Sequence, residues 1–264
     1  MPTTARFAFR YVLLVALAGL LVFWAYEISE NPSNQMFGNT VVSGPSNQRV
    51  VALTYDDGPN PPYTTAILNV LAKERVHATF FVVGRAVNAY PAIVARELRE
   101  GNAIGNHSFE HDHLIVMTPS QLRDNLRRTD AAIYAATGTH THIMRPPYGS
   151  RDWLVLNEAR RLGYTPVMWS VPLANDWEYP PASVIAARIV SHVRDGSIVV
   201  LHDGNRGVLC NRAHVNPHVC DRSSDIAATK LIIDRLKRDG YRFVTIPELL
   251  ALKRTMHTPS PGGE

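Results

Sequence analysis

The sequence predicts an α/β domain with parallel strands, preceded by an apolar N-terminal helix. Between residues 49 and 252, short apolar runs alternate with amphipathic segments about seven times, which is the pattern of parallel strands joined by crossover helices. A charge-free apolar stretch covers residues 11–26. The hydrophobic content of 45% and charged content of 19% are typical of a globular protein with a substantial core.

The apolar stretch is the first element along the chain. Extended back to Phe7, it approaches the length of about 20 residues that crosses a bilayer, so it predicts a membrane anchor. Arg6 and Arg10 lie on its leading side and favour a cytoplasmic N-terminus. A cleaved signal peptide is the alternative, although residues 23–30 offer no good cleavage site. Both interpretations place the remaining chain outside the cytoplasm, either anchored or secreted.

Composition divides the chain into four parts. Residues 1–28 form the N-terminus and anchor, 29–48 an Asn-, Ser-, Gly- and Pro-rich linker, 49–252 the globular domain, and 253–264 a flexible tail. The net charge is +4 and the isoelectric point about 9.2, but no block of basic residues stands out. We therefore expect no nucleic-acid partner.

Apolar runs rich in β-branched and aromatic residues predict the strands, and apolar residues at helical spacing predict the helices. Thr118 and Gln121 form a predicted capping box, and Gly101 and Gly240 are typical helix ends. The predicted strands cover residues 50–55, 78–83, 103–105, 142–145, 165–169, 197–201 and 241–245. The predicted helices cover residues 62–74, 90–100, 118–137, 151–162, 181–193, 225–238 and 247–252.

Polar residues follow several of these strands, and the carboxyl ends of parallel strands meet at one edge of a sheet. Asp56 and Asp57 end the first strand, where adjacent like charges are costly unless a cation or a proton relieves them. His107 and His111 are four residues apart and can face one metal ion. Two imidazoles and one carboxylate leave positions open for water. The simpler alternative is an ordinary turn capped by Asp57.

The two cysteines, Cys210 and Cys220, lie close together in one polar loop. Outside the cytoplasm a disulfide is the default expectation. The same loop contains His214 and His218, so four zinc ligands are the alternative interpretation.

Five segments in order resemble the motifs of the NodB-homology polysaccharide deacetylases, carbohydrate esterase family 4. The resemblance covers roughly residues 49–252 and implies a distorted (β/α)7 barrel. The segments are Thr54-Tyr55-Asp56-Asp57-Gly58-Pro59, His107-Ser108-Phe109-Glu110-His111, Arg145-Pro146-Pro147-Tyr148-Gly149, Asp176-Trp177 and Leu201-His202-Asp203.

By that resemblance, Asp57, His107 and His111 hold a divalent metal, usually zinc, with cobalt, nickel or manganese as alternatives. The metal would activate water and polarise the amide carbonyl. Asp56 would be the general base, and Arg145 would orient it and keep its pKa low.

The remaining implied roles concern the substrate side. The backbone N–H of Tyr148 would stabilise the oxyanion, and His202 would be the general acid for the departing amine. Trp177 and Leu201 would line the pocket for the acetyl methyl group.

One departure from the family pattern concerns the general acid. Many members carry an Asp soon after the tryptophan that corresponds to Trp169, but residues 172–174 are Pro-Leu-Ala. Asp176 is the candidate to replace it in tuning His202, and Asp203 is the weaker one. The 210–220 loop follows His202 closely, so we expect it to shape one wall of the substrate groove.

The resemblance implies a metal-dependent hydrolase that removes N-acetyl groups from an N-acetylhexosamine glycan. Peptidoglycan, chitin-type oligomers and exopolysaccharides all fit. One alternative is a deformylase or amidase acting on a lipid-linked sugar, and another is a catalytically silent glycan-binding protein. The expected partners are the glycan and, through the N-terminal helix, the membrane.

Overall fold

Seven parallel strands form the sheet in the computed structural model, which describes residues 3–171, 174–210 and 215–255. Six of them follow the order β5-β4-β3-β2-β1-β6, and β7 pairs with the start of β1. The predicted α/β class with a parallel sheet is therefore confirmed. The strands are β1 (Val50–Asp56), β2 (Thr79–Val82), β3 (Ala103–Asn106), β4 (Ile143–Met144), β5 (Thr165–Pro166), β6 (Ser197–His202) and β7 (Arg242–Phe243).

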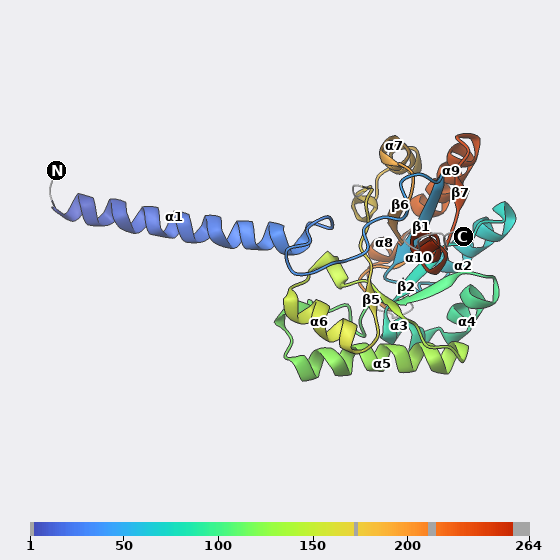
Figure 1. Cartoon of the computed structure of the whole chain (residues 1–264), viewed down its shortest axis with the longest axis horizontal. Helices are drawn as coiled ribbons and strands as arrows, with labels where there is room; N and C mark the ends of the chain where they lie inside the picture. Colours follow the sequence, from blue (N-terminus) through green and yellow to red (C-terminus); the bar gives the residue numbers. More distant parts are fainter. Residues whose placement is uncertain (1–2, 172–173, 211–214, 256–264) are drawn as a thin grey trace, which may run out of the picture.

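Helices connect the strands and cover the sheet. Figure 1 shows α5 and α6 on one side of the strands and α7 and α9 on the opposite side. The α-helices are α1 (Thr3–Glu30), α2 (Tyr63–Glu74), α3 (Gly84–Ala89), α4 (Pro91–Arg99), α5 (Pro119–Thr137), α6 (Trp153–Arg161), α7 (Ala182–His192), α8 (Pro217–Cys220), α9 (Ser223–Arg238) and α10 (Ile246–Thr255). Three 3₁₀ turns are η1 (Leu114–Val116), η2 (Pro147–Gly149) and η3 (Asp176–Glu178).

Most predicted elements are present, with differences at short segments and at the C-terminal end. Helices α3 and α8 were not predicted, because so few residues give no readable apolar period. Residues 253–255, predicted as the start of the flexible tail, belong instead to α10, whose Leu249 is buried against the core. The remaining predicted tail, residues 256–264, lies outside the described residues.

The central strand β1 is buried along its whole length, as expected for a parallel strand covered on both faces. Its alternating side chains enter two different core clusters, with Leu53 and Tyr55 in one and Ala52 in the other. The ring of Tyr55 stacks on that of Phe80 in β2, with centroids 5.2 Å apart. This packing fixes the carboxyl end of β1, where the two adjacent acids lie.

Residues 39–44, which we call the strap, lie between β5 and β6. The N–H of Val41 donates to Pro166 O at 2.9 Å, and Val41 O accepts from the N–H of Met168 at 2.7 Å. On the other side, Ser43 bridges Ser197 in antiparallel fashion. The segment predicted to be a linker is thus bonded along the domain, because its backbone groups find partners on two neighbouring strands.

Arg151 fixes the segment before the strap. Its buried guanidinium donates to the backbone carbonyls of Asn31 and Asn34, each at 2.7 Å, and of Pro32 at 3.3 Å. It also donates to Gly149 O at 2.9 Å. The five donors of a guanidinium suit such a cluster of carbonyls. Arg151 therefore connects the end of α1 to the turn η2.

Helix α1 projects away from the domain (Figure 1). Its large apolar side chains between Tyr11 and Trp24 are exposed. Within the part of the chain that the structure describes, no helix is both long enough and apolar enough to cross a membrane. The predicted membrane-spanning helix is therefore not supported.

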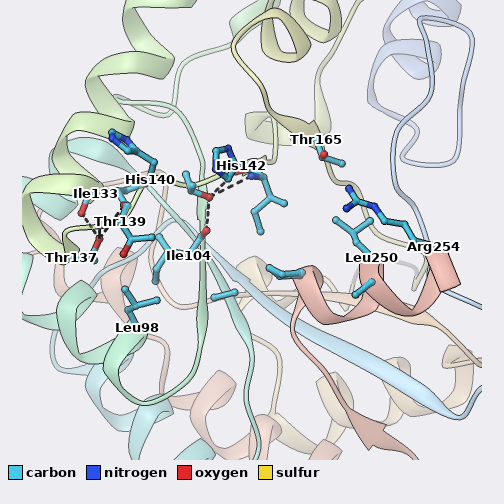
Figure 2. Close-up of a pocket in the computed structure, with 15 residues that line it drawn as sticks. Leu98, Ile104, Ile133, Thr137, Thr139, His140, His142, Thr165, Leu250 and Arg254 are labelled. Atoms are coloured by element: carbon cyan, nitrogen blue, oxygen red, sulfur yellow. Dashed lines mark hydrogen bonds between the residues drawn. The ribbon is translucent and has the colours of Figure 1, made fainter.

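A pocket opens at the amino ends of β3, β4 and β5. Figure 2 shows Ile104 and Ile133 on one side of the view and Leu250 of α10 on the other, with His142 between them. The strand ends that carry the predicted site residues lie at the opposite end of the sheet. This pocket is therefore separate from the candidate active site.

Candidate active site

Polar side chains from the carboxyl ends of the strands meet in one pocket of about 580 Å³. Strands β1 and β6 supply some of them, and the loops after β3, β4, β5 and β6 supply others. The pocket is lined by Asp56, Asp57, His107, His111, Tyr148, Gly149, Trp169, Trp177, Val200, His202, Asn205, Arg206, Val208, Val219 and Arg222.

Three of the predicted residues form a cluster of possible metal ligands. Asp57, His107 and His111 each offer one ligand atom, and these atoms lie within 4.8 Å of one another. The Oδ1 of Asp57 is 2.9 Å from Nε2 of His111 and 3.3 Å from Nε2 of His107. All three side chains are buried.

The surrounding backbone orients these ligand atoms. Nδ1 of His107 is 2.8 Å from the carbonyl oxygen of Arg145, which can only accept, so this nitrogen carries the proton and Nε2 is left to face the cluster. The N–H of His111 donates to Oγ of Ser108 at 2.9 Å. Oδ2 of Asp57 accepts from the backbone N–H of Arg206 at 2.6 Å.

The donor set fits a divalent cation. Burial opposes ionisation of Asp57, yet the neighbouring His111 and His107 hold its pKa well below the usual range. Oδ1 of Asp57 is buried without a hydrogen-bond partner, which is costly unless another group compensates it. Two imidazole nitrogens and one carboxylate oxygen are ligands that zinc accepts, with positions left open.

Asp56 has a different partner. Nη1 of Arg145 donates to its Oδ1 at 2.7 Å and also to Oγ1 of Thr54 at 2.7 Å. The other guanidinium nitrogens donate to the carbonyl oxygens of Val167 at 3.3 Å and Met168 at 3.0 Å. Arg145 is 0% exposed, so the pair lies away from water. Oδ2 of Asp56 faces the cluster of possible metal ligands and lies 4.0 Å from Nε2 of His107.

His202 lies on the other wall and is held by Asp176. Nδ1 of His202 is 2.9 Å from Oδ2 of Asp176, which also accepts the backbone N–H of His202 at 2.8 Å. Burial lowers the pKa of His202, but the charge and hydrogen bond of Asp176 outweigh it and raise that pKa to about 9. Asp203, the weaker candidate, instead accepts a hydrogen bond from Thr64 at 2.5 Å.

The predicted substrate-side residues fall into two groups. Trp177 lines the pocket, with its ring centroid 6.0 Å from that of His202. Tyr148 also lines it and has φ +60°, an uncommon backbone conformation for a bulky residue. Leu201 does not line it, because neighbouring side chains of a strand face opposite ways and Leu201 is buried in the core. Val200 occupies the expected place.

Cys210 and Cys220 are joined by a disulfide. Val208, two residues before Cys210, and Val219, directly before Cys220, line the pocket, so this loop forms part of its wall. His214, named in the alternative zinc interpretation, lies outside the described residues.

Sequence reasoning missed several residues of the site. Arg206, which binds Asp57 through its backbone, belongs to a loop whose shape no motif indicates. Arg222 lines the pocket and Asp225 lies next to Asp176, although both follow His202 by about twenty residues and only the fold brings them close. Thr54 is within the first motif, and its position two residues before Asp56 could have placed it on the same face of β1.

Comparisons with known proteins agree with this geometry. The family profile described as polysaccharide deacetylase matches residues 43–167. A peptidoglycan-N-acetylglucosamine deacetylase of Bacillus cereus is 34% identical over 210 residues, which cover 79% of this chain and 92% of the relative. The peptidoglycan-N-acetylmuramic acid deacetylase PdaA of Bacillus subtilis is also 34% identical, over 82% of this chain and 77% of the relative.

Solved structures show the same relationship. The crystal structure of the Bc1960 peptidoglycan N-acetylglucosamine deacetylase superposes with a TM-score of 0.71 and 31% sequence identity. The superposition covers 80% of this chain and 92% of the other.

The first prediction concerns metal binding. Asp57→Ala removes the carboxylate of the cluster and should lower zinc affinity at least about 100-fold, since even outer partners of metal ligands are worth 10- to 100-fold. Asp56→Asn, the matched control, should keep affinity within a few-fold because Asp56 pairs with Arg145. Titration calorimetry with zinc measures both. Equal affinities of wild type and Asp57→Ala would refute the assignment.

Proposed function

Because the chain belongs to the polysaccharide deacetylase family of metal-dependent hydrolases, we propose that peptidoglycan is the glycan from which it removes N-acetyl groups. The observation that carries the proposal is the buried cluster of Asp57, His107 and His111 beside the Arg145–Asp56 pair. The relatives named above support the substrate class, since both are peptidoglycan deacetylases.

We propose zinc as the resident metal. A divalent cation bound by Asp57, His107 and His111 would supply Lewis-acid chemistry, making water more acidic and polarising the amide carbonyl. Imidazole nitrogens favour zinc and its neighbours in the transition series over magnesium or calcium. Cobalt, nickel and manganese are the alternatives.

Asp56 is the proposed general base. Its Oδ1 is occupied by Arg145, so Oδ2 is the atom that takes the proton from the attacking water. The ion pair holds the carboxylate in place before the proton arrives. Arg145 stays protonated throughout and only positions the base.

His202 is the proposed general acid. Its Nδ1 is bound to Asp176, so Nε2 is the nitrogen that can deliver a proton to the departing amine. The backbone N–H of Tyr148 is the proposed donor to the oxyanion formed when water adds to the carbonyl. Asp176 thus takes the place of the missing Asp after Trp169, and Trp177 and Val200 form the wall nearest the acetyl group.

The second prediction tests the function itself. The zinc-loaded protein should release acetate from peptidoglycan fragments or N-acetylglucosamine oligomers, and a chelator should abolish the release. Asp56→Asn should lower kcat about 100- to 10,000-fold, the usual contribution of a general base. Acetate and formate are quantified in parallel.

Each other outcome of that assay has a meaning. Formate without acetate would indicate the deformylase alternative, and binding without either product would indicate a silent glycan-binding protein. Full activity of Asp56→Asn would refute the assigned base.

The third prediction concerns pH. The raised pKa of His202 keeps the acid protonated at neutral pH, and activity should fall as pH rises through that pKa. A bound cation offsets the charges of Asp57 and Asp56, which also raise the pKa of His202. In the metal-loaded enzyme, the alkaline limb of the pH profile therefore lies below pH 9. Asp176→Asn removes the main group raising the pKa and should move the alkaline limb of kcat/KM down by about one pH unit or more. An unmoved limb would contradict the role of Asp176.

We also propose that the domain works outside the cytoplasm, held near the membrane by α1. The Cys210–Cys220 disulfide and the exposed apolar side chains of α1 support this. Mass spectrometry of the N-terminus of protein recovered from membranes should find residues 1–28 retained. Recovery from the medium with those residues removed would indicate secretion after cleavage.

A further inference from the structure

Behind Asp176 lies a second carboxyl group, that of Asp225 in the first turn of α9. Both residues are 1% exposed, and their carboxyl groups form a hydrogen bond with each other. Double ionisation of two carboxyl groups in such contact away from water is disfavoured, because their charges repel. A pair that holds one proton avoids this repulsion.

The surroundings decide which carboxyl holds that proton. Asp176 accepts two donors from His202, its backbone N–H and Nδ1, and these stabilise the ionised form. Asp225 has no comparable donors. Its Oδ1 has no hydrogen-bond partner, and its Oδ2 lies 4.0 Å from Nη1 of Arg222, beyond hydrogen-bond distance.

Electrostatics act in the same direction. Burial, followed by the charge of Asp176, raises the pKa of Asp225 well above its usual range, while Arg222 and His202 oppose this. Arg222 is a counter-ion at a distance: its Nη1, which makes no hydrogen bond, lies 4.0 Å from Oδ2 of Asp225, and its Nε donates to Gly204 O at 2.7 Å. Tyr55 is the further titratable group beside both carboxyls, and Asp56 and Asp57 act on His202.

We propose that Asp225 is a positioning residue for the general acid: it keeps a proton and donates it in a hydrogen bond to Asp176, which in turn orients His202. No proton leaves Asp225 during turnover. Its hydrogen bond spreads the charge of Asp176, so that Asp176 holds Nδ1 of His202 without taking its proton. The proposal rests on the proposed role of His202 and adds a residue outside the five motifs.

Carbon-13 NMR of the zinc-loaded protein, labelled at the aspartate carboxyl carbon, tests the protonation directly. Spectra of Asp225→Asn and Asp176→Asn identify the two signals by their loss. At neutral pH the Asp225 signal should have the shift of a protonated acid and the Asp176 signal that of a carboxylate. An ionised Asp225 would overturn the proposal. Because this measurement needs no turnover, it is independent of whether the proposed substrate is right.

Kinetics of acetate release test the positioning role. Asp225→Asn keeps a neutral donor at the same place, so the alkaline limb of kcat/KM should stay within about 0.3 pH units. Asp225→Leu removes the donor at similar volume. It should lower kcat about ten-fold with little change in KM, and should raise the limb because Asp176 becomes more basic. The proposal would be overturned if Asp225→Asn and Asp225→Leu changed kcat and the alkaline limb equally. It would also be overturned if Asp225→Asn lowered the alkaline limb by about one pH unit.

Thr229→Val provides the matched control on the same helix. The Thr229 hydroxyl forms hydrogen bonds with the Tyr55 hydroxyl and with the backbone carbonyl of Asp225, and not with the Asp176 carboxyl. This variant should lower the melting temperature without moving the alkaline limb. A limb that moves as far in Thr229→Val as in Asp225→Leu would show a merely structural effect of α9 and overturn the proposal.

Discussion

Arg145 and Asp56 form an ion pair at the floor of the pocket, where neither side chain has appreciable contact with water. A buried charge without a partner is very costly, so the pair is stable only as a unit. The guanidinium spans from the end of β1 to the carbonyls after β5, and thereby fixes the distance between these strands. Every other group of the site is placed relative to this connection.

The pair also explains how two neighbouring acids can both be ionised. Arg145 compensates the charge of Asp56, whereas Asp57 lies beside the two histidines with its Oδ1 available to a cation. The two adjacent carboxylates therefore face different partners on two sides of the backbone. On the opposite wall, the buried charge of Asp176 is compensated by His202. The pocket thus has a wall prepared to accept a proton and a wall prepared to give one, which is the asymmetry that acid–base catalysis requires.

The sequence predicted what depends on short range and on strand direction. The order of strands and helices and the trio of possible ligands follow from parallel strands with polar residues at their carboxyl ends. The pairing of Arg145 with Asp56 was implied by the family resemblance. The true position of Leu201 could have been predicted, because side chains alternate along a strand. If His202 faces the pocket, its neighbour Leu201 must face the opposite side. Arg206 and Asp225 could not be predicted. Their contacts depend on loop shape and on the docking of α9, which no local pattern encodes.

The strap and the hydrogen bonds of Arg151 to the segment before it have a consequence for any shortened form of this protein. A fragment beginning at β1 would appear complete on the sequence, since the core strands and all five motifs would be present. It would lack the backbone groups that bond Pro166 and Met168, leaving an open sheet edge of the kind that promotes association between chains. It would also lack the three backbone carbonyls, of Asn31, Pro32 and Asn34, that accept hydrogen bonds from Arg151. The smallest self-sufficient unit therefore begins near Asn31.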